Sequence, residues 1–220
     1  MLKLIKKKIP AVIFNSHLYS AFLSFESFIK TTLWMINGEP VPPPSCIKRK
    51  IIKQYQQKYS YEVFIETGTY LGDTVYSLKD CFKTIYSIEL AHDLYLRSKA
   101  LFSSYSHISI LNGSSADILP TIMDGVDEPC IFWLDGHYSG GITALGDEVT
   151  PIIKELKCIL SHKINNHIIL VDDARLFTGE DGYPTLNDIK NVILSYPDYT
   201  ISDIDRDIIR IINPLHLVRE

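Results

Sequence analysis

Residues 64–75 read FIETGTYLGDTV, and this segment is the most informative one about the fold. The apolar run that ends at Glu66 predicts a short buried strand, and Gly68 and Gly72 predict a tight turn directly after it. A helical pattern then covers Asp73–Cys81. The glycine spacing is G-x-x-x-G, which differs from the G-x-G-x-x-G turn that binds dinucleotides.

The same alternation of strand and helix continues along the chain. The expected strands are Tyr61–Glu66, Thr84–Glu89, Ile108–Asn112, Ile131–Asp135 and His167–Asp172. The expected helices are Asp73–Cys81, Asp93–Phe102, Asp117–Met123, Glu148–Ser161 and Thr185–Ser195. Alternation of this kind predicts a mostly parallel sheet covered on both faces.

The chain ends differently. Thr200–Asp205 and Ile208–Asn213 read as two strands joined across Arg206-Asp207, which predicts an antiparallel hairpin. We therefore expect residues 61–220 to form a doubly wound, Rossmann-like α/β domain. Its seven-stranded sheet is mostly parallel and closes with this hairpin.

Residues 1–39 predict a basic, amphipathic helical arm. Bulky apolar residues recur at helical spacing from Phe14 to Ile36, and Asn37-Gly38 ends the helix. Residues 40–60 follow as a proline-rich connector and a lead-in helix over Ile47–Tyr59. The polar residues after the first lysines do not match a signal peptide, and no run of 18 apolar residues predicts a spanning helix.

The formal net charge of −4 divides unevenly along the chain. Residues 1–60 carry a charge of +8 and residues 61–220 carry −12. The acidic remainder argues against nucleic acid as a partner, because phosphate contacts need a Lys and Arg surface. The basic arm has three possible partners: its own core, a second subunit in a homo-oligomer, or an anionic membrane surface.

The composition excludes intrinsic disorder, since 46% of the residues are hydrophobic and only 22% are charged. Cys46, Cys81, Cys130 and Cys158 form no C-x-x-C pair. Free thiols in a reducing compartment are therefore favoured over disulfides or zinc. We expect a cytoplasmic protein, with the arm placing it at the inner face of the membrane if that surface is its partner.

Polar residues gather where the predicted strands end, the edge at which open α/β sheets bind ligands. They are Glu66, Glu89, Ser114, Ser115, Asp135, His137, Asp172 and Asp173. A carboxylate directly before the glycine turn would repel a pyrophosphate but suits a cationic amino acid group. Glu89 ends the next strand, where a carboxylate accepts hydrogen bonds from both ribose hydroxyls. These two features favour S-adenosylmethionine over a nicotinamide dinucleotide as the ligand.

Five segments, FIETGTYLGDTV, YSIEL, NGSSADILP, FWLDGHYSGG and ILVDDARLF, resemble class I S-adenosylmethionine-dependent methyltransferases. The resemblance covers about residues 40–213 and is to the bacterial group of macrocin-type sugar O-methyltransferases. It implies that Glu66, Gly68 and Gly72 hold the methionine part of the cofactor, that Glu89 holds the ribose, and that Ser115 and Asp117 lie beside the adenine. The expected cofactor contacts are Glu66, Thr67, Gly68, Thr69, Tyr70, Gly72, Asp73, Thr74, Glu89, Ser114, Ser115, Asp117 and Asp135.

Asp135, Asp172 and Asp173 end two strands that lie close together in such a sheet. Three converging carboxylates repel one another unless a cation or a proton intervenes, and hard divalent cations such as Mg²⁺ take oxygen ligands. The resemblance implies a metal on this triad, although the chain departs from those enzymes after Asp135. The alternative is that the carboxylates only orient a substrate or cap helices.

His137 is the candidate general base, because a neutral imidazole near pH 7 can take a proton from a hydroxyl, and Asp135 is the alternative base. Tyr138 and Arg175 are the candidate acceptor contacts, although Arg175 can instead pair with the triad. We expect an enzyme that transfers a methyl group from S-adenosylmethionine to a hydroxyl of a sugar or glycan. Two alternatives remain: a metal-dependent hydroxylase or other oxidoreductase on the same fold, and a non-catalytic cofactor-binding scaffold.

Overall fold

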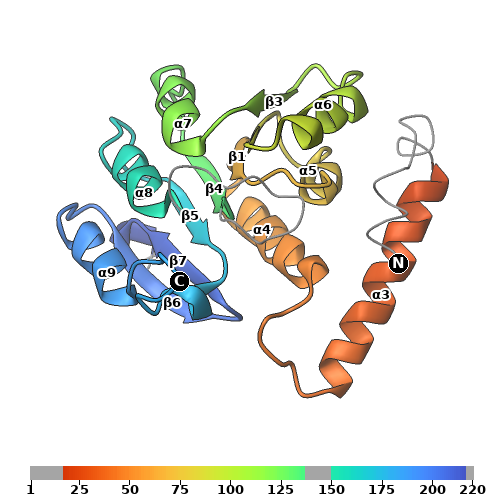
Figure 1. Ribbon diagram of the computed structural model, residues 1–220, viewed down its shortest axis with the longest axis horizontal. Coiled ribbons are helices and arrows are strands. Elements are labelled where there is room, and N and C mark those ends of the chain that lie inside the picture. Colours follow the sequence, from red (N-terminus) through yellow and green to blue (C-terminus); the bar gives the residue numbers. More distant parts are fainter. Residues whose placement is uncertain (1–16, 137–149, 217–220) are drawn as a thin grey trace.

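The computed structural model describes residues 17–136 and 150–216, and Figure 1 shows their arrangement. Seven strands form one sheet: β1 (Val63–Thr67), β2 (Thr84–Glu89), β3 (Ile108–Asn112), β4 (Cys130–Leu134), β5 (Ile168–Val171), β6 (Thr200–Asp205) and β7 (Ile208–Ile212). Their order across the sheet is β3-β2-β1-β4-β5-β7-β6. The predicted doubly wound α/β fold is confirmed.

The first five strands pair in parallel, and β7 runs antiparallel between β5 and β6. Arg206 and Asp207 turn the hairpin with φ of 49° and 66°. Positive φ at both turn residues matches the right-handed twist of the strands, which is why a two-residue connection suffices here. The predicted closing hairpin is therefore present.

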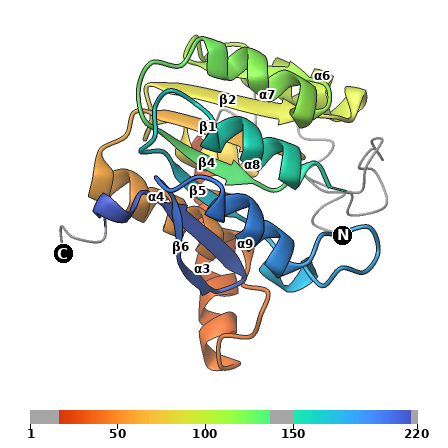
Figure 2. The ribbon, with the colours of Figure 1, turned by 90° about the vertical axis from the view of Figure 1, so that its left-hand side faces the viewer.

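Six helices of the described residues cover the two faces of the sheet, three on each side, as Figures 1 and 2 show. One side carries α4 (Ser45–Tyr59), α5 (Asp73–Leu78) and α6 (His92–Leu101); the other carries α7 (Ser115–Asp124), α8 (Ile152–Leu160) and α9 (Leu186–Leu194). Successive strand residues alternate between the two layers, so Phe64 packs on the α4 side and Ile65 on the α8 side. Both faces are buried, which explains why the central strands read as nearly continuous apolar runs.

The helix α4 belongs to the core of the sheet rather than only leading into it. Ile47, Ile51 and Ile52 are buried in the same apolar cluster as Phe64 and Ile85. The sequence predicted this helix within two residues at its N-terminus. The division of the chain at residue 61 stays a prediction.

The helix α3 (His17–Ile36) lies outside the three layers, against α4 (Figure 1). It ends where the sequence predicts, and Gly38 has a φ of +80°. Tyr19, Leu23 and Trp34 are the buried positions of this helix. The apolar face that the periodicity singled out, which includes Phe25 and Ile36, instead points away from the core.

None of the helices in the described residues has the length and apolar composition needed to cross a bilayer.

Candidate functional site

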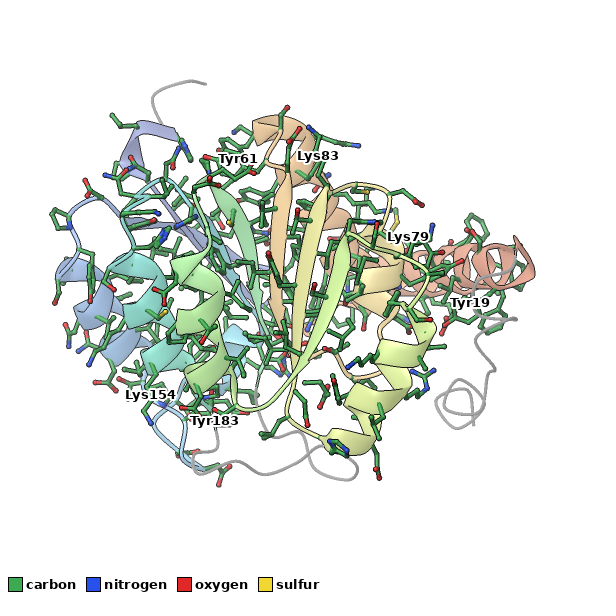
Figure 3. The ribbon with its side chains drawn as sticks, turned by 90° about the horizontal axis from the view of Figure 1, so that it is seen from above. Tyr19, Tyr61, Lys79, Lys83, Lys154 and Tyr183 are labelled. Carbon is green, nitrogen blue, oxygen red and sulfur yellow. The ribbon has the colours of Figure 1, made fainter. Side chains whose placement is uncertain are left out.

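The candidate site lies at the carboxyl ends of β2, β1, β4 and β5, which are neighbours in the sheet. The parallel strands begin along one margin of the sheet and end along the opposite margin, and we call these margins the amino edge and the carboxyl edge. Figure 3 shows Tyr61 and Lys83 at the amino edge, and Tyr183 and Lys154 at the carboxyl edge. The strand order therefore brings the predicted carboxylates together.

The glycine turn packs tightly against the end of β4. The amide of Gly68 donates to the carbonyl of Ile88 at 2.9 Å, and its φ is +91°. A Cβ atom at Gly68 would lie 2.6 Å from the carbonyl oxygen of Asp135. Only glycine fits there, because a Cβ atom would overlap this carbonyl and L side chains rarely adopt a positive φ.

Glu66 lies beneath this turn, with only 1% of its surface exposed. Its Oε2 accepts a hydrogen bond of 2.7 Å from the hydroxyl of Ser87. Burial raises the pKa of Glu66 to about 8, and the hydrogen bonds from Ser87 and Thr74 oppose that rise. Thr69 continues the network through a hydroxyl contact of 2.6 Å with Ser87. The carboxyl is thus built into the support of the turn.

Glu89 ties the turn to the end of β2. One of its oxygens accepts from the backbone N–H of Tyr70 at 2.7 Å and the other from that of Ala91 at 2.9 Å. Burial raises the pKa of Glu89, and these N–H donors oppose the rise. The carboxylate keeps further lone pairs for a ligand's hydroxyl groups.

The remaining expected cofactor contacts surround these carboxylates. Ser114 is the N-cap residue of α7, with Ser115 and Asp117 in its first turn. The hydroxyl of Thr67 accepts from the backbone N–H of Asp135 at 3.2 Å. Gly72 and Asp73 open α5.

Asp73 also accepts a hydrogen bond of 3.0 Å from the hydroxyl of Tyr19. This contact brings α3 to the glycine turn. The sequence offered no signal for it, because 54 residues separate the two partners.

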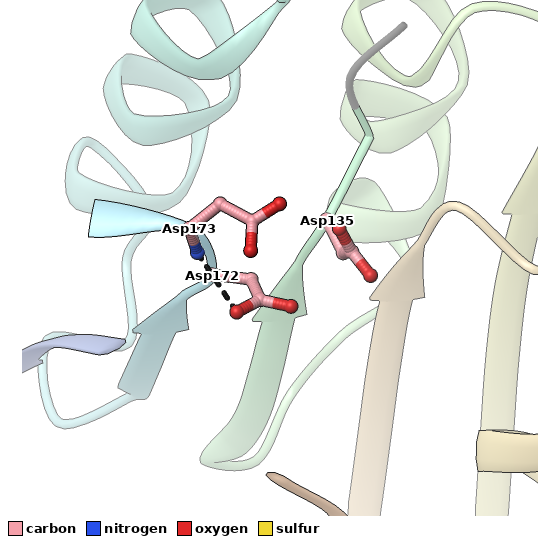
Figure 4. Close-up of side chains that lie close together, drawn as sticks. All are labelled: Asp135, Asp172 and Asp173. Carbon is pink, nitrogen blue, oxygen red and sulfur yellow. Dashed lines mark hydrogen bonds between the residues drawn. The ribbon is translucent and has the colours of Figure 1, made fainter. Parts of the chain in front are cut away.

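Asp135, Asp172 and Asp173 converge as predicted (Figure 4). One oxygen from each lies within 4.8 Å of the other two. Burial and the charges of Asp172 and Asp173 raise the pKa of Asp135 well above its usual range. Burial and Asp173 raise the pKa of Asp172 to about 6, although Lys48 opposes that rise. This cluster needs positive charge to stay ionised at neutral pH.

Lys48 of α4 supplies that charge, and sequence reasoning missed it. Its Nζ lies 2.6 Å from Asp172 and 3.1 Å from Asp173. Burial disfavours its charge, but the two carboxylates outweigh burial and raise the pKa of Lys48. No local signal identifies this residue, since Lys48 is one of several lysines on α4 and 124 positions separate it from Asp172.

Arg175 adds a second cation. Its NH1 donates to Asp173 at 2.8 Å and also to Asp207 in the hairpin turn. Of the two predicted roles for Arg175, the structure displays the pairing with the triad. Its side chain remains 38% exposed, so it also faces the solvent at the mouth.

Tyr183 stands close to the same carboxylates, although no sequence pattern singles it out. Burial raises the pKa of Tyr183 to about 12, with Asp173 and Asp135 contributing.

His137 and Tyr138 lie outside the described residues, so their roles stay predictions.

The carboxylate triad fits a divalent cation by the identity and spacing of its oxygens. Its charge, however, is already matched in part by Lys48 and Arg175. A metal ion would therefore have to displace the ammonium of Lys48 from Asp172.

The sheet order, the closing hairpin and the glycine turn define the fold of class I S-adenosylmethionine-dependent methyltransferases. Among similar solved structures is the O-methyltransferase TomG from Streptomyces achromogenes, involved in tomaymycin synthesis and solved with the cofactor. It has a TM-score of 0.59 and 14% identity, over 85% of this chain and 88% of that one.

An O-methyltransferase from Bacillus cereus, solved with S-adenosylhomocysteine, has a TM-score of 0.58 and 12% identity, over 85% of this chain and 90% of that one. A putative caffeoyl-CoA O-methyltransferase from Staphylococcus aureus has a TM-score of 0.55 and 15% identity, over 89% and 97% of the two chains. No protein-family model and no curated protein matches the sequence. At these identities the likeness establishes the fold.

Proposed function

We propose that this protein is an S-adenosylmethionine-dependent O-methyltransferase. The observation that carries the proposal is the hydrogen bond of 2.7 Å from the backbone N–H of Tyr70 to Glu89, because it sets a buried carboxylate of the kind that binds a ribose against the glycine turn. Three similar folds belong to proteins named as O-methyltransferases, two of them solved with the cofactor or its product. The cofactor contacts are those predicted from Glu66 to Asp117, with Asp135 beside the turn.

In the proposed reaction, the hydroxyl oxygen of the acceptor attacks the sulfonium methyl group in line. The C–O bond forms as the C–S bond breaks, S-adenosylhomocysteine leaves, and the hydroxyl proton passes to a base. His137 is our first candidate for the base and Asp135 the second. Positioning of the two reactants supplies much of the rate, because the chemistry needs only a bound pair and a proton acceptor.

The acceptor is proposed to be a hydroxyl on a sugar or glycan. The motifs around Asp135 and Asp172 support this through their resemblance to macrocin-type enzymes. Arg175 and Tyr138 are the proposed acceptor contacts. The free cysteines among the described residues are in keeping with a reaction in the cytoplasm.

The triad is proposed to take a divalent cation in competition with Lys48. When bound, a cation of this kind orients an acceptor hydroxyl and lowers its pKa. Asp135, Asp172 and Asp173 would hold it. In its absence, Lys48 and Arg175 keep Asp172 and Asp173 paired.

Calorimetric titration with S-adenosylmethionine tests the function. We expect binding by the intact chain and its loss in Glu89→Ala. Glu180→Ala is the matched control, because Glu180 is an exposed carboxylate in the loop before α9. Absence of binding in the intact chain, or equal affinity in Glu89→Ala, would exclude the methyltransferase assignment.

Transfer of a labelled methyl group to sugar hydroxyls then tests the reaction. His137→Ala is expected to lower kcat by about 10²–10⁴-fold while cofactor affinity is kept. An unchanged kcat in His137→Ala together with a large loss in Asp135→Asn would assign the base to Asp135.

A further inference from the structure

A groove of about 680 Å³ lies between α3, α4 and the end of α5, on the side of α4 away from the sheet. Its α4 wall carries Arg49, Lys50 and Lys53. Its α3 wall carries hydroxyl groups, such as those of Ser24 and Thr31, together with larger apolar side chains. Figure 3 shows Tyr19 of α3 beside the region of Lys79, at this end of the molecule.

None of the three cations of the α4 wall forms an ion pair within residues 17–136 and 150–216, although the charge of Arg49 opposes the rise in the pKa of buried Glu66. No ion pair or side-chain hydrogen bond of Arg49, Lys50 or Lys53 occurs in that part of the chain. By contrast, the neighbouring Lys48 is fully engaged with Asp172, and Lys79 pairs with Asp80 at 2.6 Å. The groove therefore presents net positive charge.

The apolar side of the groove continues onto the outer face of α3. Phe28 and Met35 line the groove and are 69% and 58% exposed. Phe25, Leu33 and Ile36 extend the same surface with exposures of 64%, 54% and 75%. An exposed apolar patch of this kind beside unpaired cations is the mark of an interaction surface rather than of an ordinary solvated helix.

Charge decides between two occupants of this surface. A two-fold pairing of α3 faces would bring two sets of Arg49, Lys50 and Lys53 toward each other, and the one acidic residue that lines the groove, Asp80, already pairs with Lys79. The one carboxylate in the described part of α3 is Glu26, and it pairs with Lys30 at 2.6 Å. A second copy of this chain therefore fits poorly, and an anionic surface fits well.

We propose that the α3–α4 groove and the outer face of α3 form a docking surface for an anionic phospholipid membrane. The aromatic and aliphatic side chains of α3 enter the boundary between headgroups and acyl chains, and the α4 cations contact lipid phosphates. Lys3, Lys6, Lys7 and Lys8 precede α3 in the sequence and add charge of the same sign. Lys48, the residue before Arg49, contacts the triad at the carboxyl edge of the sheet. A membrane docked on Arg49 therefore lies beside that edge.

The test is cosedimentation of the full chain with vesicles of phosphatidylcholine, with and without one third phosphatidylglycerol. We expect binding only to the vesicles that contain phosphatidylglycerol. Each cation near an anionic surface contributes roughly fivefold to partitioning, so Arg49→Gln, Lys50→Gln and Lys53→Gln together should lower it by about 100-fold. Phe25→Ser with Phe28→Ser should abolish it.

Lys157→Gln, Lys163→Gln and Lys190→Gln together form the matched control. They remove the same charge from exposed positions near α8 and α9, on the other side of the sheet. This variant should partition like the intact chain, and all variants should keep the circular dichroism of the intact chain. Inorganic phosphate at millimolar concentration should not displace the protein from the vesicles.

Three outcomes would overturn the proposal. The first is no binding to either vesicle, and the second is an equal loss in the control and groove variants. The third is a dimer in sedimentation equilibrium that Phe25→Ser with Phe28→Ser converts to a monomer, which would make this face an interface between copies. None of these outcomes depends on methyl transfer.

Discussion

Gly68 is the residue at which the backbone of the candidate site tolerates least change. Gly68→Ala would combine a positive φ, which costs about 1–2 kcal/mol, with a Cβ atom 2.6 Å from the carbonyl of Asp135. We expect the affinity for S-adenosylmethionine, measured by calorimetry, to fall by at least about tenfold. Gly38→Ala is the control, since Gly38 has a φ of +80° but no atom within 4 Å of a new Cβ. Equal affinities in the two variants would contradict the proposed role of the turn.

The raised pKa of Glu66 predicts that cofactor binding is linked to the release of a proton. Its pKa of about 8 means that the carboxyl is mostly protonated at pH 7 in the ligand-free protein. If the cationic methionine end of the cofactor pairs with Glu66, the carboxylate form becomes favoured and binding releases a proton. Calorimetry at pH 7 in buffers of different ionisation enthalpy should detect this release, and Glu66→Gln should remove it. Binding without proton release would show that Glu66 only supports the turn.

Lys48 predicts competition at the triad. Replacing Lys48 with methionine removes the ammonium from Asp172 and Asp173 while it keeps most of the apolar stem. We expect Lys48→Met to bind Mn²⁺ or Mg²⁺ more tightly than the intact chain in direct calorimetric titration. Lys50→Met is the control, because Lys50 is exposed and lies outside the triad. Weaker or unchanged metal affinity in Lys48→Met would contradict the competition.

At the scale of elements, the sequence pattern predicted most of the sheet correctly because the central strands β1, β4, β5 and β7 are buried on both faces. β2, β3 and β6 have the predicted bounds, and the hairpin turn falls at Arg206-Asp207. The structure begins α8 at Ile152 rather than at Glu148, since Pro151 is its N-cap residue. The sequence also predicted that Asp135, Asp172 and Asp173 lie close together, because neighbouring parallel strands end at the same edge of the sheet.

What the sequence did not predict depends on contacts between distant elements. Lys48 and Tyr19 reach the site from helices that precede the first strand. Their residue types are common on helices, and only the packing of α4 and α3 brings them to the edge. The same packing decides which face of α3 is exposed, and it leaves the apolar face that the periodicity singled out pointing away from the core.

The helix α4 supplies a prediction at this scale. Ile52 is fully buried between α4 and the sheet. Ile52→Ala should therefore reduce the free energy of unfolding by about 2–5 kcal/mol, measured by denaturant titration. Leu194→Ala is the control, because Leu194 is 79% exposed, and its effect should stay within about 0.5 kcal/mol. A small effect at Ile52 would show that α4 is not part of the domain core.

At the scale of the whole molecule, the two edges of the sheet have different roles. The carboxyl edge holds the acidic candidate site, whereas the amino edge holds a hydrogen-bonded histidine pair that no sequence pattern singles out. His167 Nδ1 accepts from the backbone N–H of Cys130 at 3.0 Å, so its Nε2 carries the proton and donates to His162 at 3.0 Å. His162 in turn donates to the carbonyl of Met123 at 3.1 Å. This chain of hydrogen bonds joins β4, β5 and α7.

His167 makes the free energy of unfolding depend on pH. Burial and His162 lower the pKa of His167 to about 3, whereas an unfolded histidine has its usual value near 6.5. Below pH 6.5 the unfolded chain binds a proton that the folded chain excludes, so stability is lost as pH falls. The loss amounts to about 2 kcal/mol between pH 7 and pH 5. Glu66 and Asp172 have raised pKa values and act in the opposite direction, so the contribution of His167 must be measured as a difference.

His167→Gln provides that difference, because glutamine keeps an acceptor for Cys130 and does not titrate. The stability advantage of the intact chain over His167→Gln should shrink by about 2 kcal/mol from pH 7 to pH 5, and exposed His92→Gln should show no such change. His167 lies before β5, at the edge opposite Asp172, so His167→Gln should leave cofactor affinity unchanged. Gly68→Ala should lower cofactor affinity and leave the pH dependence that comes from His167 unchanged. Altered cofactor affinity in His167→Gln, or an altered pH dependence in Gly68→Ala, would show that the two edges are coupled through the strands, contrary to the separation that the fold implies.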